Sequence, residues 1–199
     1  GINEKNRTDN EILNAFYTPR NIVKAAWKLA DYYCPSGKTV LEPTAGVGRF
    51  AEGREDKKFT LREIDPTSAR IARILHPNAE VINEAFEEQF FEEDGLVHNP
   101  NFQLPKFDIV IGNPPYGSNK GEYKGKGEGK NHDRYEEYFI EKGLDSLNGM
   151  DSVLIYVVPS GFLRSKPDNP KKLIAEKGTL IDAWRLPNKS FDSTDVGTD

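Results

Sequence analysis

Residues 108–116 read Asp-Ile-Val-Ile-Gly-Asn-Pro-Pro-Tyr, an apolar run that ends at an amide, two prolines and an aromatic ring. The apolar segment from Phe107 to Ile111 predicts a short strand that is buried on both faces of a sheet. Pro114 and Pro115 lack N–H groups and push the preceding residue to extended geometry, so the strand must stop there. The Asn113 carboxamide and the Pro114 carbonyl are then presented at the carboxyl end of a strand, where ligands bind in open α/β sheets.

The chemistry that suits such a corner is methylation of a planar amino group. An amine of this kind is a poor nucleophile because its lone pair is delocalised into a ring or carbonyl. The Asn113 side-chain oxygen and the Pro114 carbonyl could accept its two hydrogens and favour a pyramidal nitrogen whose lone pair points at a methyl donor. Tyr116 would offer an aromatic face for a flat substrate to stack on. The alternative is a plain Asn-Pro-Pro turn after a core strand, with Tyr116 at its rim.

Strands and helices alternate along the rest of the chain. One helix is expected to begin with Thr18 as N-cap and Pro19 as its first residue. Apolar periodicity predicts further helices at 66–75, 135–147 and 171–177, and strands at 39–41, 59–64, 79–82, 107–111, 152–158 and 179–186. The fold class is therefore α/β, a doubly wound and mostly parallel sheet, with one further strand expected where the sequence stops. If the sheet turns back after its third strand, the carboxyl ends of the first and fourth strands face one crevice.

The sequence Glu-Pro-Thr-Ala-Gly-Val-Gly at residues 42–48 follows the first predicted strand. Gly46 and Gly48 would let the backbone approach a ligand closely at the start of a helix, whose N–H groups point at that ligand. Glu42 would repel a pyrophosphate and attract the cationic amino group of a methionine moiety. The Gly-x-Gly spacing also fits a loose dinucleotide fingerprint, as in a nicotinamide-dependent oxidoreductase, but Glu42 and residues 113–116 would have no role in such an enzyme.

Acidic residues also end the second and third predicted strands. Glu63 is placed to accept hydrogen bonds from the two ribose hydroxyls of an adenosine, with Asp65 as N-cap of the next helix. A solvated strand end is the alternative for Glu63. Glu84 could accept a hydrogen bond from an adenine amino group, although Asn83 could take that role.

Glycine alternates with lysine directly after Tyr116, which predicts a flexible loop at residues 117–133 with nothing to bury. Its position beside the corner at 113–116 makes its lysines candidate phosphate contacts, namely Lys120, Lys124, Lys126 and Lys130. The alternative is a surface insertion that charge keeps soluble.

Length and composition narrow the classes of protein. A chain of 199 residues suits one domain with a sheet covered on both faces. A single cysteine excludes an internal disulfide, and we see no signal peptide or membrane span, so a cytoplasmic protein is expected. Three scattered histidines have no metal-ligand spacing, so no metal site is expected. The net charge of −5 does not favour nucleic-acid binding unless basic residues gather on one surface.

Four motifs occur in the order found in gamma-type adenine-N6 DNA methyltransferases: Phe16–Pro19, Leu41–Gly48, Glu63–Pro66 and Asn113–Tyr116. The chain also resembles the methylase part of large phage and mobile-element methylase–helicase proteins. The matching motifs span residues 16 to about 159, and their combination is far more specific than any one of them.

This resemblance implies one catalytic domain over residues 1–199 with a Rossmann-like fold, in which residues 1–35 close over S-adenosylmethionine. It implies methyl transfer to the N6 amine of an adenine that is flipped out of double-stranded DNA. Asn113 and Pro114 would bind that amine, and Tyr116 would stack on the base. The cofactor would be held by Tyr17, Thr18, Glu42, Thr44, Ala45, Gly46, Glu63, Ile64 and Glu84.

The chain departs from the family pattern in two ways. The family usually has Asp where Glu84 stands. Members of the family also carry a target-recognition region, which we do not find in this sequence, so recognition or helicase segments of a longer parent chain are expected partners. They usually have a second aromatic near the last strand, for which Phe191 is the candidate here. Two other functions stay open: methylation of another planar amine, such as an RNA base or a protein glutamine, and a cofactor-binding DNA-docking module without activity of its own.

Overall fold

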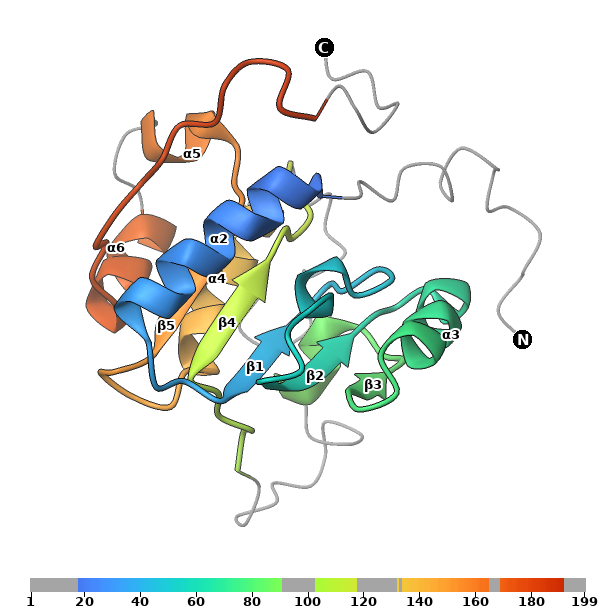
Figure 1. The fold of residues 1–199 in the computed structure, drawn as a ribbon. Coiled ribbons are helices and arrows are strands. Elements are labelled where there is room, and N and C mark those ends of the chain that lie inside the picture. Colours follow the sequence, from blue (N-terminus) through green and yellow to red (C-terminus); the bar gives the residue numbers. More distant parts are fainter. Residues whose placement is uncertain (1–17, 91–102, 118–131, 133, 165–168, 192–199) are drawn as a thin grey trace, which may run out of the picture.

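A computed structural model describes residues 18–90, 103–117, 132, 134–164 and 169–191. One parallel sheet is formed by β1 (Thr39–Glu42), β2 (Lys58–Arg62), β3 (Glu80–Ile82), β4 (Ile109–Gly112) and β5 (Val153–Tyr156). The strand order is β3-β2-β1-β4-β5, so the sheet turns back after β3 and β4 pairs with β1 (Figure 1). The predicted doubly wound sheet and its switch point between the first and fourth strands are confirmed.

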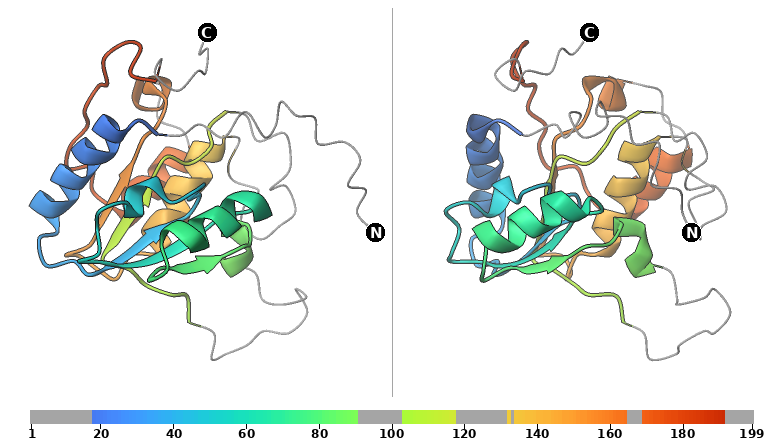
Figure 2. Two further views of the ribbon diagram at one scale, coloured as in Figure 1. Left: turned by 45° about the vertical axis from the view of Figure 1, so that its right-hand side comes forward. Right: turned by 90° about the vertical axis from the view of Figure 1, so that its right-hand side faces the viewer.

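Helices cover both faces of this sheet, and the alternation of side chains along the strands explains how. Val40 and Ile109 point to one face and join a core with α2 (Arg20–Tyr33) and α3 (Pro66–Leu75). Leu41 and Val110 point to the other face and pack with α4 (Tyr135–Asp145) and the short 3-10 helix η3 (Phe86–Phe90). Figure 2 shows α2 and α4 on opposite sides of the sheet.

The remaining helices are α5 (Ser160–Arg164), which follows β5, and α6 (Asn169–Lys177), which contacts α4. Within the described ranges, no helix is long and apolar enough to cross a membrane.

The first turns of α2 and α3 differ in how they are capped. Asp65 caps α3 as predicted, because its Oδ2 accepts a hydrogen bond of 2.7 Å from the Ser68 N–H, and Pro66 is the first helical residue. The predicted cap of α2 is wrong by one residue. Pro19 is itself the N-cap, since its ψ of 142° is extended, and Thr18 lies before the helix with no capping bond.

Two predicted elements are absent from the described chain. The helix expected after Gly48 is only the 3-10 turn η2 (Arg49–Ala51), because the backbone becomes extended at Glu52 and left-handed at Gly53, whose φ is +72°. The strand expected at 179–186 is irregular. Asp182 explains part of this, because its carboxylate accepts hydrogen bonds from the Ala183 N–H and the Trp184 indole, local bonds that compete with a sheet ladder.

Candidate functional site

Two loops leave neighbouring strands at the carboxyl edge of the sheet. The cofactor loop (residues 42–48) follows β1, and the acceptor corner (residues 113–117) follows β4. A Cβ atom added at Gly112 would lie 3.6 Å from Pro43 Cδ and 3.8 Å from Glu42 Cγ, so the two loops begin side by side. The structure therefore brings together the two groups of residues that the sequence predicted for donor and acceptor.

Glu42 carries a carboxylate that the protein leaves unsatisfied. The residue is 2% exposed, and its Oε2 has no hydrogen-bond partner among the described residues. Burial, and then the nearby charge of Glu63, raise the pKa of Glu42 well above its usual range. The buried hydroxyl of Thr44 likewise has no partner among the described residues. Buried polar atoms are normally hydrogen-bonded, so these two atoms are candidates to bind a polar group from outside the described chain.

The backbone of the cofactor loop is held in a tight turn. The Gly48 N–H donates to the Ala45 carbonyl at 2.8 Å, and the Ala45 N–H donates to the Arg62 carbonyl of β2 at 2.8 Å. Gly46 and Gly48 have φ values of +56° and +82°, a left-handed conformation that favours glycine. The turn itself therefore favours glycine at both positions, beside the close approach to a ligand for which the sequence predicted them.

His76, at the end of α3, supports this loop, and the sequence analysis did not find it. Its Nε2 lies 3.1 Å from the Val47 carbonyl oxygen, and a Cβ atom at Gly48 would lie only 2.6 Å from its Cδ2. The ring therefore lies directly against the backbone of Gly48. A histidine that ends a helix carries no sequence signal for such a contact, because the contact depends on how α3 packs.

Glu63 links the cofactor loop to the end of β2. Its Oε2 accepts from the Gly46 N–H and its Oε1 from the Asp65 N–H, each at 2.7 Å. Burial raises the pKa of Glu63, although these backbone donors oppose the shift. Each carboxylate oxygen retains a further lone pair, so this residue can shape the loop and still accept from a ligand. Ile64 beside it is 60% exposed, an apolar surface next to the loop.

The two candidates after β3 have different surroundings. Asn83 donates its amide N–H to the Glu63 and Ile64 carbonyls at 2.8 and 3.1 Å, which fixes its side chain. Glu84 is exposed and lies 3.5 Å from the guanidinium of Arg62. At the other end of the site, the Thr18 carbonyl accepts from Arg49 at 3.2 Å. Thr18 itself is buried.

Asn113 and Tyr116 contact each other within the acceptor corner. The Tyr116 hydroxyl donates to Asn113 Oδ1 at 2.9 Å, which leaves a second lone pair on that oxygen. Burial raises the pKa of Tyr116, so the phenol stays neutral and able to donate. Tyr116 is 36% exposed, and Pro114 is buried. Part of Tyr116 is thus accessible to solvent.

Several predicted residues lie outside the described residues, namely Tyr17, Lys120, Lys124, Lys126 and Lys130. Phe191 lies in a turn and is partly buried.

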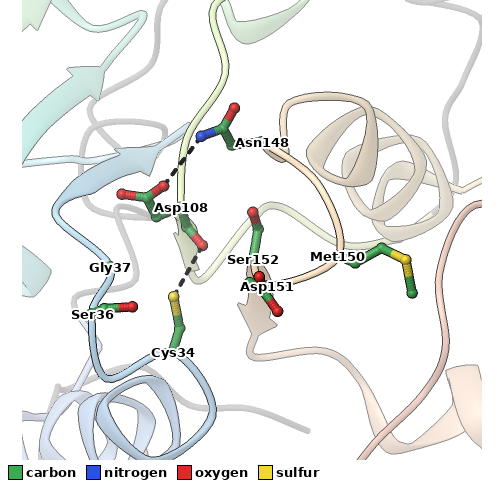
Figure 3. Close-up of a pocket in the computed structure, with 8 residues that line it drawn as sticks. All are labelled: Cys34, Ser36, Gly37, Asp108, Asn148, Met150, Asp151 and Ser152. Carbon is green, nitrogen blue, oxygen red and sulfur yellow. Dashed lines mark hydrogen bonds between the residues drawn. The ribbon is translucent and has the colours of Figure 1, made fainter.

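The opposite edge of the sheet has a cavity of about 280 Å³ (Figure 3). It is lined by Cys34, Ser36, Gly37, Asp108, Asn148, Met150, Asp151 and Ser152. Asp108 accepts from the backbone N–H groups of Lys38 and Thr39 at 2.8 and 3.0 Å, and these bonds lower the pKa of Asp108 to about 2. The carboxylate here serves the fold, because the protein already supplies its donors.

The family model described as Eco57I restriction-modification methylase matches residues 37–191. The chain belongs to this methylase family. The expected resemblance to a methylase family is therefore confirmed at the level of restriction-modification methylases. The Eco57I family uses S-adenosylmethionine, so the predicted cofactor is confirmed as well.

Two curated relatives are viral. The defense against restriction protein B of Escherichia phage P1 is 29% identical over 94% of this chain and 8% of its own length. The type II methyltransferase M.CvrRI of Paramecium bursaria Chlorella virus XZ-6E is 26% identical over 98% of this chain and 48% of its own length. The chain thus spans under a tenth of one relative and about half of the other.

Solved structures share the fold at low identity. A chain of a type I restriction-modification system has a TM-score of 0.59 and 20% identity, over 83% of this chain and 36% of its own. A 16S rRNA N2 G1207 methyltransferase of T. thermophilus, in complex with AdoMet and guanosine, has a TM-score of 0.52 and 16% identity, over 82% of this chain and 39% of its own. These likenesses confirm the methyltransferase fold.

Proposed function

We propose that the chain carries S-adenosylmethionine-dependent methyl transfer to the exocyclic N6 amine of adenine in DNA. The observation that carries this proposal is the meeting of two loops at one edge of the sheet. An unsatisfied, buried carboxylate ends β1, and an Asn-Pro-Pro-Tyr corner follows β4 beside it.

The residues of the cofactor loop fit S-adenosylmethionine. The Glu42 carboxylate and the Thr44 hydroxyl, both buried and unsatisfied, suit the cationic amino group of its methionine part. Glu63 has lone pairs for the ribose hydroxyls, and exposed Ile64 suits an apolar ring. Glu84 is the candidate for the adenine amino group. Tyr17, Thr18, Ala45 and Gly46 complete the proposed set.

The acceptor corner would activate the amine. Asn113 Oδ1 and the Pro114 carbonyl accept its two hydrogens, which localises the nitrogen lone pair for attack. S-adenosylmethionine would supply an electrophilic methyl group on a positively charged sulfur. As the new C–N bond formed, the C–S bond would break and S-adenosylhomocysteine would leave, and the methylated nitrogen would release one proton to water. The ring of Tyr116 holds the flat base by stacking. This stacking offsets the cost of flipping a base out of a duplex, which is roughly a few kcal/mol. A protein without a catalytic cysteine can do this, because no covalent enzyme intermediate is needed.

DNA is the proposed substrate because the chain belongs to a restriction-modification methylase family and resembles a type II methyltransferase. We propose that residues 1–199 act as one catalytic domain. Because the chain spans only 8% and 48% of its curated relatives, we propose that recognition or helicase segments of a longer parent chain select the target sequence.

The test is transfer of a labelled methyl group from S-adenosylmethionine to mixed-sequence duplex DNA, followed by digestion to nucleosides. Cofactor binding is measured by calorimetry in the same sample. Label in N6-methyladenosine is the expected result. Label in RNA or in protein glutamine, with none in DNA, would move the function to another planar amine. If this chain and the longer parent both bind cofactor and neither labels DNA, the chain would be a cofactor-binding docking module without activity of its own.

A further inference from the structure

The acceptor corner is fastened to the first turn of α4. The Gly117 N–H donates to Glu136 Oε2 at 2.9 Å, and the Gly117 carbonyl accepts from the Tyr135 N–H at 3.0 Å. Both backbone polar groups of the residue directly after Tyr116 are therefore bound by one helix. Gly117 has a φ of +110°, which side-chain-bearing residues rarely adopt, so the backbone leaves the corner in a defined direction.

The carboxylate that holds Gly117 is fully buried. Glu136 is 0% exposed, and its second oxygen is bound by the guanidinium of Arg134, whose side chain is 46% exposed. A buried charge is costly unless it is paired and hydrogen-bonded, and here the backbone of the acceptor corner supplies one of the bonds. One of the two donors to this buried carboxylate, the Gly117 N–H, therefore belongs to the proposed active site.

We propose that Glu136 is a positioning residue for methyl transfer, which holds Gly117 and thereby sets the placement of Tyr116 and Asn113. The proposal rests on the function proposed above. Glu136 acts through a chain of contacts: its carboxylate binds the Gly117 N–H, Gly117 follows Tyr116 directly, and the Tyr116 hydroxyl donates to Asn113 Oδ1 at 2.9 Å. A shift of Gly117 would therefore move both the stacking ring and the acceptor oxygen.

A purely structural role for Glu136 is the rival explanation, because an acid in the first turn stabilises a helix. The neighbouring Glu137 offers a matched control. It is also buried, at 4% exposed, and its Oε2 accepts from the Arg134 N–H at 3.3 Å in a capping box. Both acids belong to the same turn, but it is Glu136 that accepts the hydrogen bond from the Gly117 N–H.

The experiment compares E136A, E136Q and E137A in this chain, beginning with amide hydrogen exchange at Gly117. Relative to wild type and to the stability of each variant, E136A should raise that exchange rate at least tenfold. E136Q keeps an oxygen that can accept from the N–H and should stay within about threefold. E137A should leave Gly117 exchange near wild type. Equal exchange at Gly117 in E136A and E137A would overturn the proposal.

Titration of Tyr116 by NMR gives a second reading, with Tyr116→Phe to assign the signal. The charge of Glu136 contributes to the raised pKa of Tyr116, so E136Q should lower this pKa and E137A should not. An unchanged Tyr116 pKa in both E136A and E136Q would show that Glu136 does not set the surroundings of the ring.

Kinetics then relate the placement to the reaction. E136A should lower kcat about tenfold or more and leave the affinity for S-adenosylhomocysteine within threefold, and E136Q should restore most of the kcat. Equal losses of kcat in E136A and E137A would assign Glu136 to helix stability alone. If this chain and its longer parent both bind cofactor and neither methylates DNA, the proposed function is contradicted, while exchange and titration at Gly117 and Tyr116 would still decide the role of Glu136.

Discussion

Glu42 and Asp108 are two carboxylates at opposite edges of one pair of strands, and their surroundings are opposite. Glu42 ends β1 at the carboxyl edge, is buried with an unsatisfied oxygen and has a raised pKa. Asp108 directly precedes β4 at the amino edge, binds the backbone N–H groups of Lys38 and Thr39 and has a lowered pKa. The fold supplies hydrogen bonds to Asp108 and leaves an oxygen of Glu42 unsatisfied, which is the acid that we propose to bind the cofactor.

The largest effect on methyl transfer is expected at Asn113, at the carboxyl edge, with Asn148 at the amino edge as its control. Asn113→Ala should lower methyl transfer by about a thousandfold, or about 4 kcal/mol in the barrier, because the amine loses an acceptor at the reacting atom. Cofactor binding should stay within about tenfold, or about 1.4 kcal/mol. Asn148→Ala at the amino edge removes only a bond of 3.4 Å to Asp108 and should leave transfer unchanged. Transfer rates and calorimetry check both, and unchanged turnover in Asn113→Ala would remove this residue from the chemistry.

The next largest effects are expected from substitution of the two carboxylates, on cofactor binding at Glu42 and on stability at Asp108. Glu42→Gln should weaken binding of S-adenosylhomocysteine about a hundredfold, or about 2.7 kcal/mol, and should not lower the free energy of unfolding, since it removes a buried charge. Asp108→Asn should do the reverse. It should lower the free energy of unfolding by about 2 kcal/mol, because hydrogen bonds to a charged acceptor are lost, and leave binding unchanged. Urea unfolding and calorimetry on both variants test the contrast, which fails if both lose binding equally.

A pair of glycines sharpens the comparison further. A Cβ atom would lie 2.6 Å from His76 Cδ2 at Gly48 and 2.6 Å from Cys34 Sγ at Gly37, so both alanine variants are overpacked. Gly48 also has a positive φ, so Gly48→Ala should cost about 1–2 kcal/mol more than Gly37→Ala in the free energy of unfolding. Gly48→Ala alone should weaken cofactor binding. Equal free energies of unfolding and equal cofactor affinities in the two variants would mean that the cofactor loop rearranges to accommodate a side chain at position 48.

Much of the fold could be read from the sequence, because strongly apolar runs and turn residues act locally. Residues 107–116 gave the strand and its stop, and the helix at 66–75 was predicted with its Asp65 cap. The strand expected at 179–186 could not be judged in this way. A segment of this kind forms a strand only beside a partner strand that completes its hydrogen bonds, and here Asp182 bonds to the neighbouring Ala183 N–H while Leu180 and Ile181 stay exposed.

The candidate site was predictable where chemistry lies in motifs. Glu42, Gly46 and Asn113 could be predicted because strand ends and their spacing bring them together. His76 and Glu136 could not, since each reaches this region through a contact with the backbone of another segment. Such contacts depend on packing between α3 or α4 and the loops, and a single sequence holds no local sign of them.

The smallest effect is on the pH dependence of stability, and the two acids should give opposite slopes. Asp108 has a folded pKa of about 2, below its ordinary value, so its contribution is present above about pH 4 and is lost as the pH falls toward 2. Glu42 has a raised pKa in the folded state. Between its ordinary value and that raised pKa the folded protein binds more protons than the unfolded one, so stability falls as the pH rises.

Urea unfolding of wild type, Glu42→Gln and Asp108→Asn between pH 3 and pH 8 would resolve the two slopes. Glu42→Gln should flatten the decline that begins above the ordinary pKa of a glutamate, and Asp108→Asn should flatten the loss below pH 4. Saturating S-adenosylhomocysteine should also flatten the first slope in wild type, because a cationic amino group next to Glu42 favours its charged form. If the ligand left that slope unchanged, Glu42 would not face the amino group, and the difference between the two edges would have another cause.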